Sequence, residues 1–332
     1  MTSFIIPKIS RSEYMKRLRK RPFENMKTIQ AVESLLINKR GYIFKMPPPG
    51  TPIILLVSGG LDSTSLWGLL LEKYGLHVYP LFLYRDNHRS KKEHTAAKFF
   101  SIYFHKRYPT LSEKVYTFST RLSPPEIMRA LKNPLRYYHP QRLLDQINTK
   151  NGSLANNMPN CHPQRVLPYL HVFYCLVYSQ YLLEHFNIRA KTIFTAILVG
   201  DGLFVPGQTF TSLQTALLSI CSVTAEYDWQ YCSLPLEREL GYWMEKKDLI
   251  IIGHALGIPL EKTWSCYKAG RYQCGNECLT CHSRRLEFRR AHIKDKTQYA
   301  FNQPNRRIIL LLQRLLDKAL HLVYATLKGG RA

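Results

Sequence analysis

The feature that most constrains this chain is the hexapeptide SGGLDS at residues 58–63. It follows an unbroken apolar run at residues 53–57, which is typical of a strand that is buried on both faces. The residues after it have helical character from 65 to 73. In this order of strand, loop and helix, the free N–H groups at the helix N-terminus face the loop and attract an anion. The pattern therefore predicts a phosphate-binding loop.

The composition of the loop indicates how it would bind phosphate. Its two glycines allow the backbone to wrap closely around oxygen atoms, and its two serines can donate hydroxyl hydrogen bonds. Asp62 is acidic where an anion should bind, so we expect it to contact phosphate through Mg²⁺. The loop is not a Walker A motif, and it resembles the SGGxDS signature of PP-loop enzymes, which cleave ATP between the α and β phosphates. The predicted ATP-binding residues are Ser58, Gly59, Gly60, Leu61, Asp62 and Ser63.

Strand-like and helix-like segments alternate along the chain, which predicts a parallel sheet in a doubly wound α/β domain. The predicted strands are residues 53–57, 77–84, 115–118 and 192–198. The predicted domains are a basic N-terminal extension with a Pro-rich linker (1–50), a PP-loop ATP-binding α/β domain (51–265), a zinc-binding element (266–300) and a basic C-terminal helix (301–332). We expect two helices in the extension, at residues 10–21 and 26–36, and an irregular insertion or lid from about 120 to 165.

A compact group of cysteines lies near the C-terminus. Four thiols within 16 residues, spaced C-x7-C-x3-C-x2-C, suit a closed tetrahedral Zn²⁺ site of the structural kind. The predicted ligands are Cys266, Cys274, Cys278 and Cys281. The other four cysteines are scattered through apolar or mixed surroundings, so we expect them to be packed or free thiols.

The charge is strongly basic, at +24, and it is concentrated at the two ends. Residues 1–50 carry 11 basic and 3 acidic side chains, and residues 282–332 carry 12 and 3. Solubility alone could explain this excess, but it favours an acidic macromolecular partner, either nucleic acid or an acidic protein. No apolar run approaches the roughly 20 residues of a membrane span. We therefore expect a cytoplasmic protein without a membrane partner.

The segment G-I-P-L-E-K-T-W-S-C at residues 257–266, together with the phosphate loop and the cysteine group, resembles the 7-cyano-7-deazaguanine synthases. The resemblance extends over roughly residues 53–300. Members of this family use ATP to activate 7-carboxy-7-deazaguanine, form an amide with ammonia and dehydrate the amide to a nitrile. The resemblance thus implies a small deazaguanine substrate, with ATP, Mg²⁺ and Zn²⁺ as cofactors.

Site residues follow from the same resemblance. Asp62, Ser63 and Lys247 are implied as catalytic residues. The implied substrate-binding residues are Tyr84, His88, Arg165, Asp201 and Pro206. The chain departs from the family at Gly207-Gln208, where an Asp-Cys pair is usual, and at residues 163–166, where Pro-Gly-Arg-Asn is usual. These changes lie around the small substrate, whereas the ATP and zinc motifs are retained.

Several alternatives stay open at this point. One is a ligase that makes the nitrile 7-cyano-7-deazaguanine, and another transfers the activated deazaguanine to an amine of a partner protein, as in an anti-phage defence system. A third is a PP-loop enzyme that modifies tRNA or DNA. An inactive nucleotide-binding scaffold is disfavoured by the intact loop at residues 58–63. A homodimer is also left open.

Overall fold

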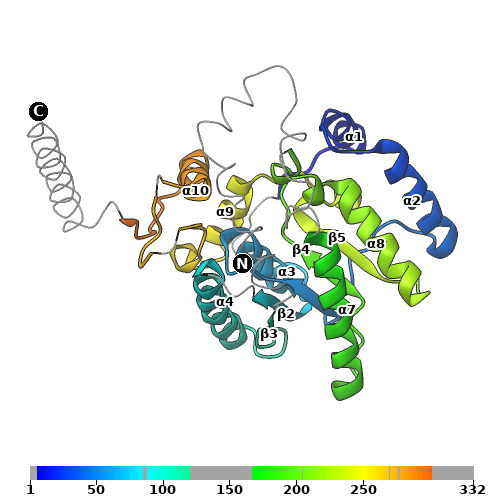
Figure 1. Ribbon diagram of the computed structural model, residues 1–332, viewed down its shortest axis with the longest axis horizontal. Helices are drawn as coiled ribbons and strands as arrows, with labels where there is room; N and C mark the ends of the chain where they lie inside the picture. Colours follow the sequence, from blue (N-terminus) through cyan, green and yellow to red (C-terminus); the bar gives the residue numbers. More distant parts are fainter. Residues whose placement is uncertain are drawn as a thin grey trace, which may run out of the picture.

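The computed structural model describes residues 6–84, 88–119, 167–203, 205–268, 270–275 and 277–300. Within these ranges the chain forms a five-stranded sheet with helices on both faces (Figure 1). The strands are β1 (Pro52–Leu56), β2 (His77–Tyr84), β3 (Tyr116–Ser119), β4 (Thr192–Thr195) and β5 (Gln230–Ser233). Their order is β3-β2-β1-β4-β5, and every neighbouring pair is parallel. The predicted α/β class with a parallel sheet is confirmed.

Successive side chains of a strand pack alternately in two separate hydrophobic cores, one on each face of the sheet. In β1, Ile53 and Leu55 belong to one core, whereas Ile54 and Leu56 belong to the other. This follows from strand geometry, because successive side chains point to opposite faces of a sheet. It also explains why the run is apolar without interruption, since both faces of this strand are covered.

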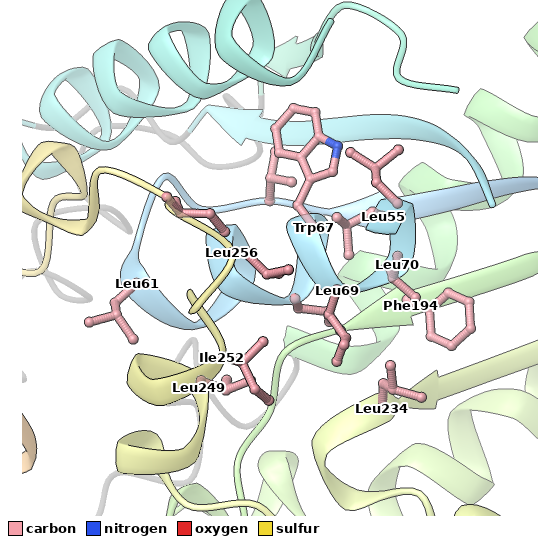
Figure 2. Close-up of a cluster of buried hydrophobic side chains, with 14 of the residues drawn as sticks. Leu55, Leu61, Trp67, Leu69, Leu70, Phe194, Leu234, Leu249, Ile252 and Leu256 are labelled. Carbon is pink, nitrogen blue, oxygen red and sulfur yellow. The ribbon is translucent and has the colours of Figure 1, made fainter. Parts of the chain in front are cut away.

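The first core lies between the sheet and the helices that follow β1, β2 and β5. These helices are α3 (Leu61–Glu72), α4 (His88–Arg107), α9 (Lys246–Ala255) and α10 (Leu279–Arg290). Figure 2 shows Leu69 of α3 close to Ile252 of α9, with Phe194 of β4 beside them. Trp67 is buried on the side of α3 that faces α4, where its ring lies 4.9 Å from that of Phe104. Burial of this set fixes α3, and with it the loop at its N-terminus.

The second core includes the N-terminal segment. The helices of this face are α1 (Arg11–Arg19), α2 (Met26–Arg40), α7 (Leu167–Phe186) and α8 (Phe210–Thr224). Tyr14, Leu18, Ile29 and Leu36 of α1 and α2 are each 0% exposed. The Tyr14 hydroxyl donates a hydrogen bond of 2.7 Å to the Leu236 carbonyl oxygen. The two helices predicted in the extension are therefore present, and they are part of the folded domain rather than a detached arm.

Four of the five strands in the described part of the chain were predicted, although β4 is shorter than expected. The short strand β5 was missed. The predicted insertion at 120–165 and the predicted C-terminal helix both lie outside the described residues. No helix in the described ranges is both long and apolar enough to cross a membrane.

The sheet order places a topological switch between β1 and β4. From β1 the chain proceeds outward through β2 to β3, and from β4 it proceeds to β5 on the other side. In doubly wound sheets, ligands bind at the carboxyl ends of the strands beside this switch. The loop at residues 58–63 follows β1 directly, so it lies at this position.

Candidate active site and cysteine centre

The backbone of the phosphate loop approaches α4 too closely for any residue but glycine at position 59. Gly59 has a φ of +66°, and a Cβ atom there would lie 2.1 Å from the Glu93 carbonyl oxygen and 2.9 Å from the Ala97 nitrogen. Such contacts are prohibitive against helix backbone, and the left-handed conformation is itself unfavourable for other residues. The first glycine of the motif therefore sets the path of the loop.

The two serines brace the loop from within. The Ser58 backbone N–H donates to the Ser63 Oγ at 3.1 Å, and the Gly60 N–H donates to the Ser58 Oγ at 3.2 Å. Gly60 is the N-cap of α3, and no side chain forms a capping hydrogen bond there. The first N–H groups of α3 are thus directed at the loop without a side-chain cap, which is the arrangement that binds an anion.

A lysine from α9 reaches the loop and forms an ion pair with Asp62. The distance from Lys246 Nζ to Asp62 Oδ2 is 2.7 Å, and the side chains are 27% and 24% exposed. Lys247, which the resemblance implies as catalytic, is the next residue of α9, and its amine faces Glu245 at 3.5 Å. Consecutive helical residues point about 100° apart, so only one of two adjacent lysines can reach the loop.

Asp201, which follows β4, joins this pair in one electrostatic group. Burial alone would lower the pKa of Lys246, but attraction to Asp62 and Asp201 outweighs burial and raises it. Burial raises the pKa of the Asp201 carboxyl; the charge of Lys246 opposes this shift and that of Asp62 adds to it. Asp62 Oδ1 is buried and has no hydrogen-bond partner among the described residues. An unpaired carboxylate oxygen beside an anion-binding helix end fits a hard cation such as Mg²⁺.

The structure places the other predicted substrate residues as follows. Tyr84 ends β2, and its ring lies 5.5 Å from that of His94. Asp201 Oδ2 accepts a hydrogen bond of 2.8 Å from the Leu198 N–H. Pro206 is half-buried at the start of a short 3₁₀ helix, Pro206–Gln208. The side chain of His88 and all of Arg165 lie outside the described residues.

The four cysteines predicted to bind zinc come together. Their Sγ atoms all lie within 4.8 Å of one another, and all four residues are buried. The Sγ atom of Cys278 lies 3.4 Å from that of Cys274 and 4.0 Å from that of Cys266. A tetrahedral site with Zn–S bonds of about 2.3 Å requires S···S distances of about 3.8 Å. Cys266 Sγ also accepts backbone N–H groups from Lys268 and Cys274, at 3.3 and 3.4 Å. The donor set therefore fits zinc.

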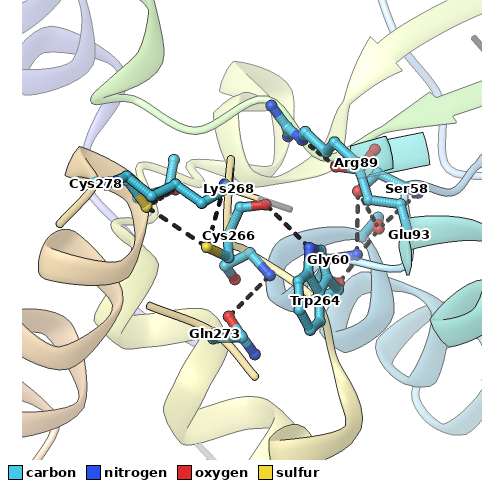
Figure 3. A network of polar contacts seen from close by, with 12 residues as sticks. Ser58, Gly60, Arg89, Glu93, Trp264, Cys266, Lys268, Gln273 and Cys278 are labelled. Atoms are coloured by element: carbon cyan, nitrogen blue, oxygen red, sulfur yellow. Dashed lines mark hydrogen bonds and ion pairs between the residues drawn. The ribbon is translucent and has the colours of Figure 1, made fainter. Parts of the chain in front are cut away.

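The cysteine centre is joined directly to the phosphate loop (Figure 3). The backbone N–H of Trp264 donates to the Gly59 carbonyl oxygen at 2.9 Å, and the Trp264 indole N–H donates to the Cys266 carbonyl oxygen at 2.9 Å. From the other side, the Arg89 guanidinium lies 4.0 Å from the centroid of the Tyr267 ring. The segment that begins the cysteine group thus supports the loop, a connection that the sequence motifs did not reveal.

The fold and this site together define an α/β protein of the PP-loop type. The sequence profile described as "Queuosine biosynthesis protein QueC" matches residues 233–292. The 7-cyano-7-deazaguanine synthase of a Ruegeria species is 26% identical over 255 residues, covering 74% of this chain and 92% of that protein. The synthase of Caldicellulosiruptor saccharolyticus is 25% identical over 253 residues, covering 74% and 94%. The chain is therefore similar to the 7-cyano-7-deazaguanine synthases over most of its length, as a divergent relative.

Shorter and more distant similarities complete the comparison. The 7-cyano-7-deazaguanine synthase of a Nitratiruptor species is 46% identical over 56 residues, which is 17% of this chain and 25% of that protein. The solved structure of the U34-tRNA thiolase NcsA from Methanococcus maripaludis, with its [4Fe-4S] cluster, has a TM-score of 0.32 and 11% identity. It covers 84% of this chain and 75% of that one, and its low score supports no further conclusion.

Proposed function

We propose that this protein is an ATP-dependent enzyme that adenylates 7-carboxy-7-deazaguanine and transfers the activated carbonyl to a nitrogen nucleophile. The observation that carries the proposal is the cluster of Asp62, Lys246 and Asp201 beside the N-terminus of α3. The similarity to 7-cyano-7-deazaguanine synthases supports the choice of substrate.

In the first step a carboxylate oxygen of the substrate attacks the α-phosphorus of ATP. A C–O–P linkage forms, the bond between the α-phosphorus and the bridging oxygen breaks, and pyrophosphate leaves with the electron pair. The N-terminus of α3 and the serine hydroxyls would bind the pyrophosphate part, and Lys246 would place a positive charge beside it. Mg²⁺ held through Asp62 would neutralise further phosphate charge. The protein's main contribution is the orientation of the two reactants.

In the second step a nitrogen nucleophile attacks the acyl carbon, loses a proton to solvent and displaces AMP. With ammonia the product is the amide. A second ATP can then activate the amide oxygen, and loss of AMP and of both N–H protons leaves the nitrile. The leading proposal for the final product is therefore 7-cyano-7-deazaguanine. Mass spectrometry of a reaction with 7-carboxy-7-deazaguanine, ATP and ammonia tests it, and conversion that stops at the acyl adenylate would contradict it.

A second candidate is conjugation of the activated deazaguanine to an amine of a partner protein, as in an anti-phage defence system. The loop that follows Asp201 favours it, because Gly207-Gln208 stand where the resemblance expects Asp-Cys. An enzyme that needs only one activation would tolerate this loss. A stable amide on a protein encoded by a neighbouring gene, with little free nitrile, would favour this candidate. A third candidate is modification of a tRNA or DNA base, which incubation with tRNA or DNA in place of ammonia would test.

We further propose that exposed basic residues dock an acidic macromolecular partner. The C-terminal end of α1 carries the exposed residues Lys16 and Arg19, and the exposed Lys20 follows as its C-cap. Because α1 also buries core residues, charge reversal is a cleaner test than deletion of the segment. Reversal of these three charges should weaken binding and reduce its salt dependence, whereas Lys106→Glu on α4 should not. Equal binding by both variants would leave solubility as the explanation of the charge.

A further inference from the structure

Arg21 is a buried cation whose guanidinium forms no hydrogen bond with the described residues. It follows α1 and is 6% exposed, and none of its three guanidinium nitrogens has a hydrogen-bond partner in the described part of the chain. The Glu24 carboxylate lies 3.7 Å from the Arg21 Nε. The Glu24 oxygens instead accept the backbone N–H groups of Phe210 and Thr211, at 2.9 and 2.8 Å, at the start of α8.

A second buried arginine, Arg284, has a structural role, because its hydrogen bonds join separate parts of the fold. Arg284 is 1% exposed, and its terminal nitrogens donate to the Thr263 hydroxyl, the Leu260 carbonyl and the Thr297 hydroxyl at 2.7, 2.7 and 2.9 Å. Such bonds offset the loss of hydration. Arg21 has none of them in the described part of the chain, and its charge is balanced by the ion pair with Glu24 instead. Its guanidinium N–H groups are therefore not used to tie elements of the fold together by hydrogen bonds, which points to a role in the site beside it.

The guanidinium of Arg21 packs against the loop that carries Asp201. A Cβ atom on Gly202 would lie 2.3 Å from the Arg21 Nη2, so the glycine is what permits this approach. The Trp243 ring centroid lies 5.6 Å from the guanidinium carbon. Burial lowers the pKa of Arg21, and the charges of Glu24 and Asp201 oppose this shift. Positive and negative groups thus alternate from Arg21 through Asp201 and Lys246 to Asp62.

We propose that Arg21 is a positioning residue for the substrate, because it holds the loop at Asp201 and Gly202 against the N-terminal segment and keeps Asp201 directed at the site. The segment before residue 50, which lies outside the resemblance to the synthases, then completes the substrate site. This inference rests on the proposed function in so far as the loop is taken to bind the deazaguanine.

The test compares Arg21→Met with Arg21→Lys and with the control Arg17→Met. Arg17 lies over the same Trp243 ring, at 5.9 Å, but is 45% exposed and pairs with Glu13. In pyrophosphate exchange, Arg21→Met should raise the KM for 7-carboxy-7-deazaguanine at least about 10-fold and leave the KM for ATP within about 2-fold. Its melting temperature should fall only slightly, because Glu24 keeps its hydrogen bonds from the Phe210 and Thr211 N–H groups. Arg21→Lys should recover part of the loss, and Arg17→Met should behave like the wild type.

Two results would overturn the inference. One is a large fall in the melting temperature of Arg21→Met with equal losses for both substrates, which is the signature of a structural residue. The other is unchanged kinetics. If the wild type itself does not use 7-carboxy-7-deazaguanine, the proposed function fails, and hydrogen exchange decides the inference alone. Faster exchange in Arg21→Met confined to residues 198–209 supports it, and an unchanged exchange pattern refutes it.

Discussion

Replacement of Lys246 by methionine tests the central ion pair of the site. The side chains are similar in length, so the change removes the charge and retains most of the apolar stem. The pair at 2.7 Å is about a quarter exposed on each side, so its loss should destabilise the fold by less than the roughly 3–5 kcal/mol of a fully buried pair. We expect about 1–3 kcal/mol, measured as a shift in the urea midpoint.

The effect on catalysis should be larger than the effect on folding. Removal of one preorganised group that stabilises transition-state charge typically lowers the rate by about 10²–10³-fold. Lys246→Met should therefore reduce the rate of pyrophosphate exchange by that factor. Lys247→Met is a matched control on the same helix, because its amine faces Glu245 and not the loop. An equal loss in the two variants, or retention of the rate in Lys246→Met, would refute the assignment.

Three further predictions concern the loop, a buried acid and the metal. Gly59→Ala should abolish ATP binding in a nucleotide titration, because the new Cβ atom would lie 2.1 Å from the Glu93 carbonyl oxygen. Gly257→Ala is the control, since Gly257 also has a positive φ, +67°, but open space around it. This variant should bind ATP normally, and the strain should lower its stability by only about 1 kcal/mol. Burial raises the pKa of Glu237 from 4.5 to about 8, so the folded state retains a proton that the unfolded state releases, and stability should fall as the pH rises from 4.5 to about 8. Urea midpoints of Glu237→Gln should show a flatter pH dependence over this window. Elemental analysis should find one zinc per chain. Removal of the zinc by a chelator should weaken ATP binding, because Trp264 joins the cysteine group to the loop. Unchanged ATP affinity in the metal-free protein would contradict this coupling.

The phosphate loop and the cysteine group could be predicted from sequence because each is a local pattern. Their spacing within a few residues already determines which groups converge. The lysine of the site could not be predicted in this way, because a motif match does not distinguish between two adjacent lysines. Only the direction of each side chain from α9 separates Lys246, which reaches Asp62, from Lys247.

The features that were missed depend on contacts between distant parts of the chain. Strand β5 contains Gln230, which does not suit a buried strand by itself. Its side-chain amide is satisfied by the backbone N–H and carbonyl of Lys45, both at 2.8 Å. In the same way, the basic composition of the N-terminal segment concealed that Tyr14 and Leu18 are core residues. Arg21 had no sequence signal, because its role depends on Gly202.

The most direct test of the account is the identity of the products formed from ATP. The purified protein is incubated with ATP, Mg²⁺ and 7-carboxy-7-deazaguanine, and the nucleotides are separated by chromatography. We expect AMP and pyrophosphate that appear only when the deazaguanine is present and that Asp62→Ala abolishes. ADP and phosphate, or AMP whose formation is independent of the deazaguanine, would contradict the account.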